Sequence, residues 1–397
     1  MMHICHRPIR PRSAPLPRPR IATLLACVAL VPGVFAKPAV SPPAADLVAA
    51  FNLATNYTQA LLVEGLPIVA SAAVSPYALR EAEFLIRQQI GHRPDLLRAM
   101  AAERIRFVVM ATTEMTTDVP EHSDLRPATY WNRRARGLGA TAARPAVSCG
   151  EENLLCLPGD PYATENILIH EFAHVVHEWG MKRVDPTFDD RLLAAYLHAR
   201  SNGLWKGTYA MENRAEYWAE GTQSWFDTNR ADDNEHGPVD TRDEVKQHDP
   251  ELARLLAEVY GDGPWRYQRP AARSAAGQSH LAGFDPAQRP GFRWPPRAKG
   301  PAELGERLTW LTPAQLPAAS PPSEGTATSI ALVNRRRDLV HIAWIDFEGK
   351  RKDYGAIRPG LSELLSTYPG HAWVFSANGV ELGGAVAGPR DGRVEIR

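Results

Sequence analysis

The chain has 397 residues, of which 44% are hydrophobic and 23% charged, with 45 basic and 45 acidic side chains. This length and hydrophobic content are typical of a globular protein large enough for two domains. Because the formal net charge is zero, the composition offers no basic surplus that would favour nucleic acid or an anionic membrane surface as a partner.

Residues 1–36 have the order of a secretory signal peptide. A basic region comes first, with no acidic residue before Asp46, and the apolar run 21–31 follows. Small residues then end at Ala36, after which we expect cleavage. The run is too short to cross a bilayer, and no later segment is apolar enough to do so. We therefore expect a secreted or periplasmic protein with no membrane span.

A lipoprotein is the alternative for this end of the chain. Leu24-Leu25-Ala26-Cys27 resembles a lipid-attachment box, in which case the protein is anchored at Cys27. The apolar stretch before Cys27 is shorter than in most such signals, so the secreted form is preferred.

Residues 37–263 are predicted to form an α+β domain. Apolar residues at helical spacing predict helices over about 47–62 and from Tyr77 to Ile90, the second ended by Gly91. The short, β-branched run from Arg106 to Ala111 predicts a buried strand, and a loop-rich stretch follows it. Further helices are predicted over residues 164–180, 188–199, 212–226 and 250–260.

Two cysteines, Cys149 and Cys156, remain after removal of the signal peptide. In an exported protein, two cysteines that flank a short loop most simply form a disulfide. We therefore expect a bond between them that stiffens the segment before the 164–180 helix.

The most informative motif is the segment 169–176, which contains His170, Glu171 and His174. Residues four apart lie on one face of a helix, so both imidazoles can bind a single Zn²⁺. Glu171 is then placed to accept a proton from a water molecule. The alternative is an ordinary buried helix in which both histidines are hydrogen-bonded.

A zinc site of this kind needs a third protein ligand. Gly180 occupies the position at which a metzincin has its third histidine, and His177 lies a further turn along the helix. Glu216, on the next amphipathic helix, is the better candidate. Glu220 follows one turn later, where it can accept a hydrogen bond from a zinc histidine. The alternative for the line formed by Glu212, Glu216 and Glu220 is a solvated stripe.

These motifs resemble a known family. HEFAH followed by TYAMENRAEYWAEG is similar to the gluzincin peptidases, most closely to the catalytic domain of anthrax lethal factor, over about residues 100–260. The resemblance implies an α+β zincin-like fold, a Zn²⁺ cofactor and a protein or peptide substrate. It implies zinc ligation by His170, His174 and Glu216, a general base at Glu171, oxyanion stabilisation by Tyr209 and support of a zinc histidine by Glu220.

The remaining chain changes character twice. Residues 264–325 are rich in proline and predict a largely irregular linker. Residues 326–397 contain short runs with apolar residues at every second position, which predict a small all-β sandwich. The runs are SIALVN, LVHIAWIDF, HAWVFS, VELGGAV and RVEIR.

The stretch from Val333 to Phe375, which includes WIDFEG and TYPGHAW, resembles the β domain of the von Hippel–Lindau tumour suppressor. That family binds 4-hydroxyproline between two Trp, a Tyr, a Ser and a His. The resemblance carries these roles to Trp344, Trp373, Tyr354, Thr367 and His371, with Thr367 in place of the Ser. It implies a partner that contains hydroxyproline, such as a collagen-like or plant cell-wall chain. The alternative is that both tryptophans are ordinary core residues.

Taken together, these patterns predict a secreted zinc metallopeptidase with a tethered module for hydroxyproline-containing protein. Two alternatives stay open. One is a secreted binding protein whose zincin domain is inactive, and the other is a peptidase whose β domain is only structural.

Overall fold

The computed structural model describes residues 40–397, apart from residues 126–127, 234, 295–304 and 323–327. The predicted signal peptide over residues 1–36 and the alternative lipid site at Cys27 lie outside the described residues. Residues 40–294 form an α+β region, and the described residues after 304 form a β-rich region.

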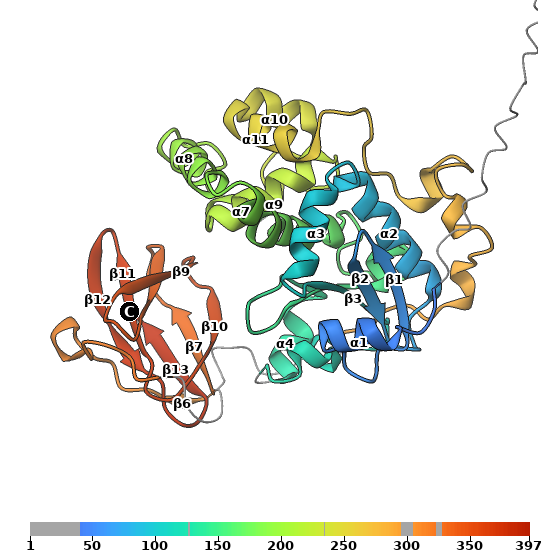
Figure 1. Ribbon diagram of the computed structural model, residues 1–397. Coiled ribbons are helices and arrows are strands. Elements are labelled where there is room, and N and C mark those ends of the chain that lie inside the picture. The colour runs from blue at the N-terminus through green and yellow to red at the C-terminus, as the bar shows by residue number, and fades with distance from the viewer. Residues whose placement is uncertain (1–39, 126–127, 234, 295–304, 323–327) are drawn as a thin grey trace, which may run out of the picture. The chain divides into compact units, whose positions relative to one another are not determined.

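The α+β region contains a five-stranded mixed sheet of order β1-β2-β3-β5-β4 (Figure 1). β1 and β2 form an antiparallel hairpin, β2, β3 and β5 run parallel, and β4 is antiparallel to β5. Among the described strands β4 pairs only with β5, so it forms an edge of the sheet. The strands are Gln59–Val63 (β1), Leu66–Ala70 (β2), Arg106–Met110 (β3), Gly137–Leu138 (β4) and Ala146–Gly150 (β5).

The strand predicted after Arg106 is confirmed, and it is buried on both faces of the sheet. Because successive side chains of a strand point to opposite faces, Phe107 and Val109 join the main hydrophobic core. Val108 and Met110 join a smaller core on the other face, together with Phe51 of α1 (Ala45–Phe51).

The helix predicted over about 47–62 is wrong beyond Phe51. Asn52 adopts a left-handed conformation with φ 49°, which ends α1. The chain then forms β1, which turns back into β2 through Glu64 and Gly65, both with positive φ. The apolar residues after Phe51 therefore belong to a β-hairpin, and they pack into the two hydrophobic cores on either side of the sheet.

The other predicted helices are present. The helix predicted over 164–180 begins at Ile167 and continues past Gly180, because a π-helical turn (Val176–Met181) joins α6 to α7. The helices after α1 are Pro76–Ile90 (α2), Pro94–Ala102 (α3), Ala128–Arg134 (α4), Glu151–Leu154 (α5), Ile167–Val175 (α6), Lys182–Val184 (α7), Phe188–Ser201 (α8), Arg214–Trp225 (α9), Arg242–His248 (α10) and Pro250–Tyr260 (α11).

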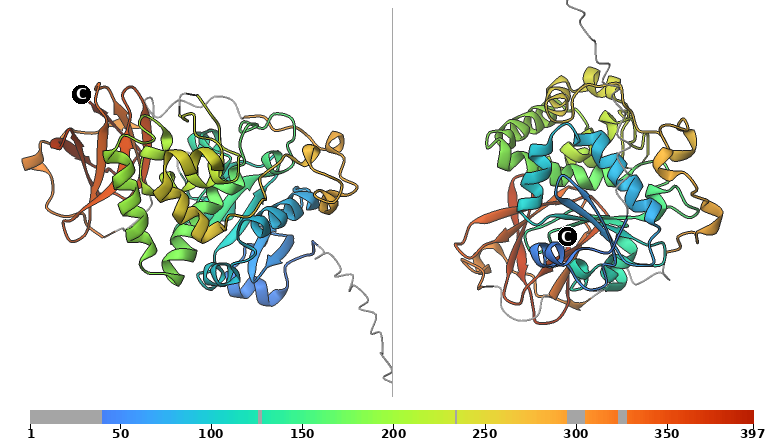
Figure 2. Two further views of the ribbon diagram at one scale, coloured as in Figure 1. Left: turned by 90° about the horizontal axis from the view of Figure 1, so that it is seen from above. Right: turned by 45° about the vertical axis from the view of Figure 1, so that its right-hand side comes forward.

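The first part of the predicted Pro-rich linker packs beside α2 (Figures 1 and 2). Residues 264–294 contain three short 3₁₀ turns, Pro270–Ala272, Ser279–Leu281 and Pro286–Gln288. Glu81 of α2 is fully buried, and both of its oxygens are bound by the guanidinium of Arg273, at 2.6 and 2.9 Å. His280 Nε2 lies 2.6 Å from the same carboxylate. These charged contacts hold the segment against the helix.

The β-rich region consists of two four-stranded sheets, of order β10-β7-β13-β6 and β12-β11-β8-β9. Their facing residues share one core that includes Ile330, Trp344, Trp373, Phe375 and Val394. The strands are Glu306–Arg307 (β6), Thr328–Asn334 (β7), Val340–Ile345 (β8), Arg351–Ile357 (β9), Ser362–Thr367 (β10), Ala372–Ala377 (β11), Val380–Val386 (β12) and Gly392–Ile396 (β13).

The sequence does not predict β9, because its first four residues, Arg351 to Tyr354, are exposed and mostly charged. The end of the predicted linker also belongs to this region. β6 pairs with β13, Leu311 pairs with Gly384, and Trp310 stacks on Phe375 with 5.8 Å between ring centroids.

Candidate metal centre and aromatic pocket

Two asparagine side chains hold the start of α6, the helix that carries HEFAH. Asn166 is the N-cap and accepts a hydrogen bond from the backbone N–H of Ile169 at 3.1 Å. The Oδ1 of Asn153 accepts another from the N–H of Ile167 at 2.8 Å. With its first N–H groups satisfied in this way, α6 begins at a fixed residue, and this fixes the direction in which its histidines point.

α9 brings the distal carboxylate to α6. Its N-cap, Asn213, accepts hydrogen bonds from the N–H groups of Ala215 and Glu216, so Glu216 lies in the first turn. Trp218 is buried, and its Nε1–H donates to the carbonyl of Ala173 at 3.1 Å. This bond fixes α9 against α6 with Glu216 facing the histidines.

Three side chains converge between the two helices. Oε2 of Glu216 lies 3.2 Å from Nε2 of His170 and 3.4 Å from Nε2 of His174. The three atoms lie within 4.8 Å of one another. Oε2 of Glu216 is buried and makes no hydrogen bond with any described residue. A buried carboxylate oxygen without a hydrogen bond is costly unless a cation is held there, and two imidazole nitrogens with one carboxylate oxygen fit zinc.

The ionisation states of Glu216 and His170 depend on each other. Burial works against ionisation of Glu216, but His174 and His170 outweigh it and lower the pKa of the carboxyl. Burial likewise opposes a charge on His170, yet contacts with Glu216 and Glu220 raise the pKa of its imidazole well above the usual range. Without a metal ion, the site therefore favours a carboxylate paired with protonated imidazole.

Glu171 lies between the two histidines in sequence and close to the sheet edge in space. A Cβ atom on Gly139, just after β4, would lie 3.6 Å from Oε2 of Glu171. A Cβ on Gly137 would lie 2.6 Å from Cγ2 of Ile167, so glycine lets β4 approach α6 closely. Burial raises the pKa of Glu171, and His170 and His174 partly oppose this shift.

The ring of Tyr209 lies near the imidazole of His170. It begins a short 3₁₀ turn, Tyr209–Met211, and its backbone N–H donates to the carbonyl of Glu235 at 2.6 Å. Its ring is nearly parallel to that of His170, with 6.4 Å between centroids. The negative charge of Glu216, followed by burial, raises the pKa of the Tyr209 hydroxyl well above its usual value.

Gln223 is a contact of His170 that the sequence analysis missed. Its Oε1 lies 2.8 Å from Nδ1 of His170. Glu220, which was predicted to contact a zinc histidine, has its Oε1 at 3.4 Å from the same nitrogen. Gln223 follows Glu216 by seven positions and so lies on the same helix face. That spacing is the signal that could have identified it.

His177 and Glu212, which the sequence analysis weighed beside the predicted ligands, lie elsewhere. His177 is fully buried, and its Nε2 contacts Oδ1 of Asp189 at 2.9 Å. Glu212 precedes the N-cap of α9 and is therefore not part of the helical line formed by Glu216 and Glu220.

The predicted disulfide between Cys149 and Cys156 is wrong, because both cysteines are free. Cys149, in β5, points into the main core, where burial raises the pKa of its thiol. α5 follows, and Cys156 comes after it with a left-handed φ of 51° and an exposed side chain. The intervening helix turns the two side chains into different environments.

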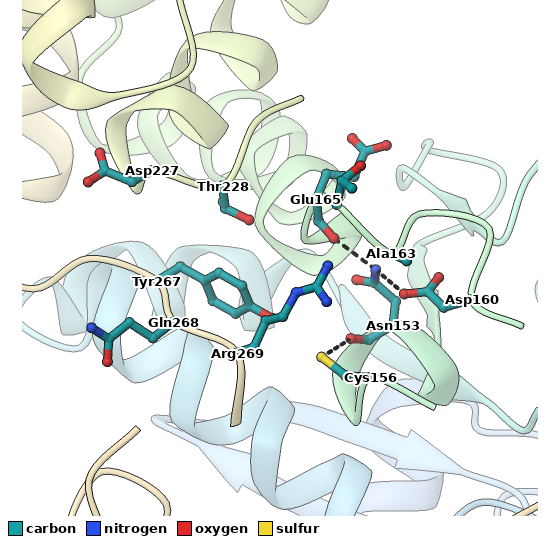
Figure 3. A pocket seen from close by; sticks show the side chains of 11 residues that line it. Asn153, Cys156, Asp160, Ala163, Glu165, Asp227, Thr228, Tyr267, Gln268 and Arg269 are labelled. Carbon is teal, nitrogen blue, oxygen red and sulfur yellow. Dashed lines mark hydrogen bonds between the residues drawn. The ribbon is translucent and has the colours of Figure 1, made fainter. Parts of the chain in front are cut away.

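Cys156 instead lines a polar cavity of about 180 Å³ (Figure 3). Asp160 and Glu165 lie on one side of this cavity, and Tyr267 and Arg269, from the segment beside α2, lie on the other. Burial raises the pKa of Asp160 to about 6. Glu165 connects this cavity to the candidate metal centre, because its Oε2 accepts a hydrogen bond from Nε2 of Gln223, which contacts His170.

The five predicted hydroxyproline-binding residues lie together in the β-rich region. Trp344 and Trp373 are directly opposite each other on β8 and β11. The ring of His371 stacks on Trp344 at 5.2 Å, and the ring of Tyr354 meets Trp373 edge to face at 4.8 Å. Thr367 Oγ1 accepts a hydrogen bond from Nε1 of Trp373 at 3.0 Å.

Their exposure is uneven. Tyr354 is 50% exposed, whereas Trp344 is 8% and Trp373 2% exposed. Thr367 and His371 are also buried, and burial lowers the pKa of His371. The arrangement is a pair of buried tryptophans with a hydroxyl and a largely neutral imidazole beside them, open to solvent along Tyr354.

Within the described residues, no helix is both long and apolar enough to cross a membrane. No curated protein matches the chain. Residues 323–385 match the family model of the VHL beta domain, and the C-terminal part of the chain therefore contains a VHL beta domain.

Proposed function

We propose that the chain is a secreted zinc metallopeptidase of the gluzincin type, with a VHL beta domain that recognises hydroxyproline-containing protein. The observation that carries the peptidase proposal is the convergence of His170, His174 and Glu216 beside Glu171. The order of basic, apolar and small residues in 1–36 supports export.

His170, His174 and Glu216 would hold the metal. A zinc ion bound there supplies a Lewis acid that polarises a carbonyl and brings the pKa of water to about 7. Glu171 accepts the proton of the attacking water at its carboxylate and later passes it to the leaving amine. Because burial raises its pKa, Glu171 is a stronger base than an exposed carboxylate. The Tyr209 hydroxyl stays protonated and donates a hydrogen bond to the developing oxyanion.

The edge strand β4 supports a peptide as the substrate. Its open side can accept an extended chain by β-augmentation, in which backbone hydrogen bonds provide affinity independent of side chains. Gly139 follows β4 directly and lies beside Glu171 and His174. A peptide paired with β4 therefore passes next to the proposed base and a proposed zinc ligand.

Hydroxyproline recognition is supported by the VHL beta domain and by the chemistry of the five side chains. Aromatic faces hold a pyrrolidine ring, while Thr367 and His371 can bond its hydroxyl. A buried polar pair that bonds this hydroxyl would be left unsatisfied by proline, which is the basis for discrimination. Tethering such a module to the peptidase raises the effective concentration of substrate.

The test is digestion of a peptide library that contains hydroxylated and plain substrates, with zinc content measured on the same full-length preparation. We expect one bound zinc per chain and cleavage that a chelator abolishes. Stoichiometric zinc without cleavage would favour the alternative of a secreted binding protein with an inactive zincin domain. Chelator-resistant cleavage, or no zinc, would contradict the proposed centre.

A second candidate for the β domain is a purely structural role. The near-complete burial of Trp344 and Trp373 favours it, because tryptophans at such positions commonly stabilise a core. Calorimetry with a hydroxyproline peptide and its proline twin separates the two candidates. Equal affinity for the two peptides, or no binding, would leave the structural role.

A further inference from the structure

A series of buried hydrogen bonds leads from His170 to Glu165, which is paired in turn with Arg230. Nδ1 of His170 lies 2.8 Å from Oε1 of Gln223. Nε2 of Gln223 donates to Oε2 of Glu165 at 3.1 Å and faces the carbonyl of Asn166 at 3.4 Å. Oε1 of Glu165 lies 3.1 Å from Nε of Arg230. Gln223 is fully buried, and Glu165 is only 9% exposed.

The donor and the acceptor in each contact of Gln223 can be assigned. The carboxylate of Glu165 and the carbonyl of Asn166 are acceptors only, so the Gln223 group that faces both must be the NH₂ donor. The other end of the amide, Oε1, must then accept from His170. This requires a proton on Nδ1 of His170, so in the neutral imidazole, the form that binds a metal ion, the lone pair is on Nε2, which faces Glu216 and His174.

We propose that Gln223, oriented by Glu165, is the positioning residue that fixes the tautomer and ring direction of His170 for metal binding. This inference rests on the zinc site of the proposed function. Supporting contacts of this kind are expected to change metal affinity by about 10–100-fold. Glu165 also lines the cavity of Figure 3. The contacts from His170 through Gln223 to Glu165 therefore end at that cavity.

Glu220 is the competing candidate. Its Oε1 is 3.4 Å from Nδ1 of His170, farther than Oε1 of Gln223. Its other oxygen accepts from Nδ2 of Asn229 at 3.2 Å and faces Nε2 of His236 at 3.4 Å. Glu220 therefore mainly holds the chain after α9, while Gln223 makes the shorter contact with the imidazole.

The test is a competition titration of the full chain against a chromophoric chelator, which gives the apparent Kd for zinc. Gln223→Met keeps the length of the side chain but removes the acceptor, and we expect its Kd to rise about 10–100-fold. The exchange E165Q/Q223E returns an acceptor to His170 and a donor to position 165, and is expected to bind within about threefold of the parent. E220Q is expected to bind more tightly than Gln223→Met.

Gln89→Met is the matched control. Gln89 is also a fully buried helical glutamine, but its amide has no hydrogen-bond partner among the described residues. The Gln89→Met variant should bind zinc with the same affinity as the parent. If Gln223→Met fails to fold, E165Q alone keeps the test open, because only the longer contact with the carbonyl of Asn166 then orients the Gln223 amide, and we expect about a threefold to tenfold loss of zinc affinity.

The outcomes are distinguishable. Parent-like zinc affinity in Gln223→Met, or in E165Q if Gln223→Met does not fold, with zinc bound by the parent, overturns the role of Gln223 but leaves the proposed function intact. A parent that binds no zinc overturns both.

Discussion

Oε2 of Glu216 lies 3.2 Å from Nε2 of His170, and this contact joins α9 to α6. A carboxylate in such a buried position needs a positive partner, since an unpaired buried charge costs several kcal/mol. The two helices therefore meet at a point that favours either a proton shared with imidazole or a bound cation. The following predictions depend on which of these the protein holds.

Glu171→Gln should retain zinc but lose turnover. The amide is close in shape to the carboxylate but cannot accept the proton of water, so kcat should fall about 10²–10⁴-fold. The measurement is kcat on a cleaved library peptide, together with zinc content. Glu178→Gln, in the π-helical turn after α6 and partly exposed, is the control and should behave as the parent. Parent-like turnover in Glu171→Gln would mean that another group is the base.

Tyr209→Phe should lower kcat by about 10²-fold with little change in KM. In the proposed mechanism the hydroxyl donates only once an oxyanion forms, and one such hydrogen bond contributes about 3 kcal/mol. Tyr77→Phe is the control, because the Tyr77 hydroxyl bonds only the carbonyl of Ala282 at the surface. A change in KM alone would indicate that Tyr209 only binds substrate.

Thr367→Val should abolish preference for hydroxyproline over proline. Valine keeps the shape of the threonine but removes both the bond to the ligand hydroxyl and the acceptor of Nε1 of Trp373. We expect the difference in binding free energy between the two peptides, about 1–3 kcal/mol, to vanish in calorimetry. Ser366→Ala, on the exposed face of β10, should leave the preference unchanged.

Stability should fall in mild acid because of His122. This side chain is buried, and burial lowers its pKa from 6.5 to about 4. The folded state thus binds fewer protons than the unfolded state between these values. The contribution of His122 is complete above pH 6.5 and is lost as the pH falls towards 4. Between pH 7.5 and 4.5 the parent should lose about 2–3 kcal/mol more than His122→Gln in urea unfolding.

Reducing agent should not change the thermal midpoint. Cys149 and Cys156 are free, so no covalent loop is available to be opened. A disulfide closing so short a loop would contribute about 2–3 kcal/mol, a shift that scanning calorimetry detects easily. A lower midpoint in reductant would show that the two thiols pair in solution.

Local signals in the sequence identified the elements best. The helix predicted over 250–260 matches α11, which Asp249 caps, Pro250 begins and Gly261 ends. The i, i+4 spacing relates His170 and His174 on α6, whereas Glu216, on α9, was proposed from its place on the next amphipathic helix and from the gluzincin resemblance. Their convergence depends on Trp218 bonding Ala173, a contact no spacing reveals.

The misses have one physical cause: tertiary contacts decide where a side chain points. The cysteine pair looked like a disulfide because spacing does not indicate direction, and Cys149 faces the core. Gln223 was not predicted because an uncharged glutamine in a helix has no sequence feature that marks a role. Its role depends on the packing of α9 against α6, which brings its Oε1 to His170. β9 has an exposed face, so its strand depends on pairing with β8 and not on apolar alternation.

The brevity of β4 has a consequence for solubility. A long, flat sheet edge is a template on which other copies of a chain can polymerise into fibres. β4 contributes only two residues to this edge, of which Gly137 is buried and has no side chain that could pack against an added strand. Under the proposed function a single peptide substrate can still pair with these two residues, while the edge is too short to support the stacking of further copies of the chain.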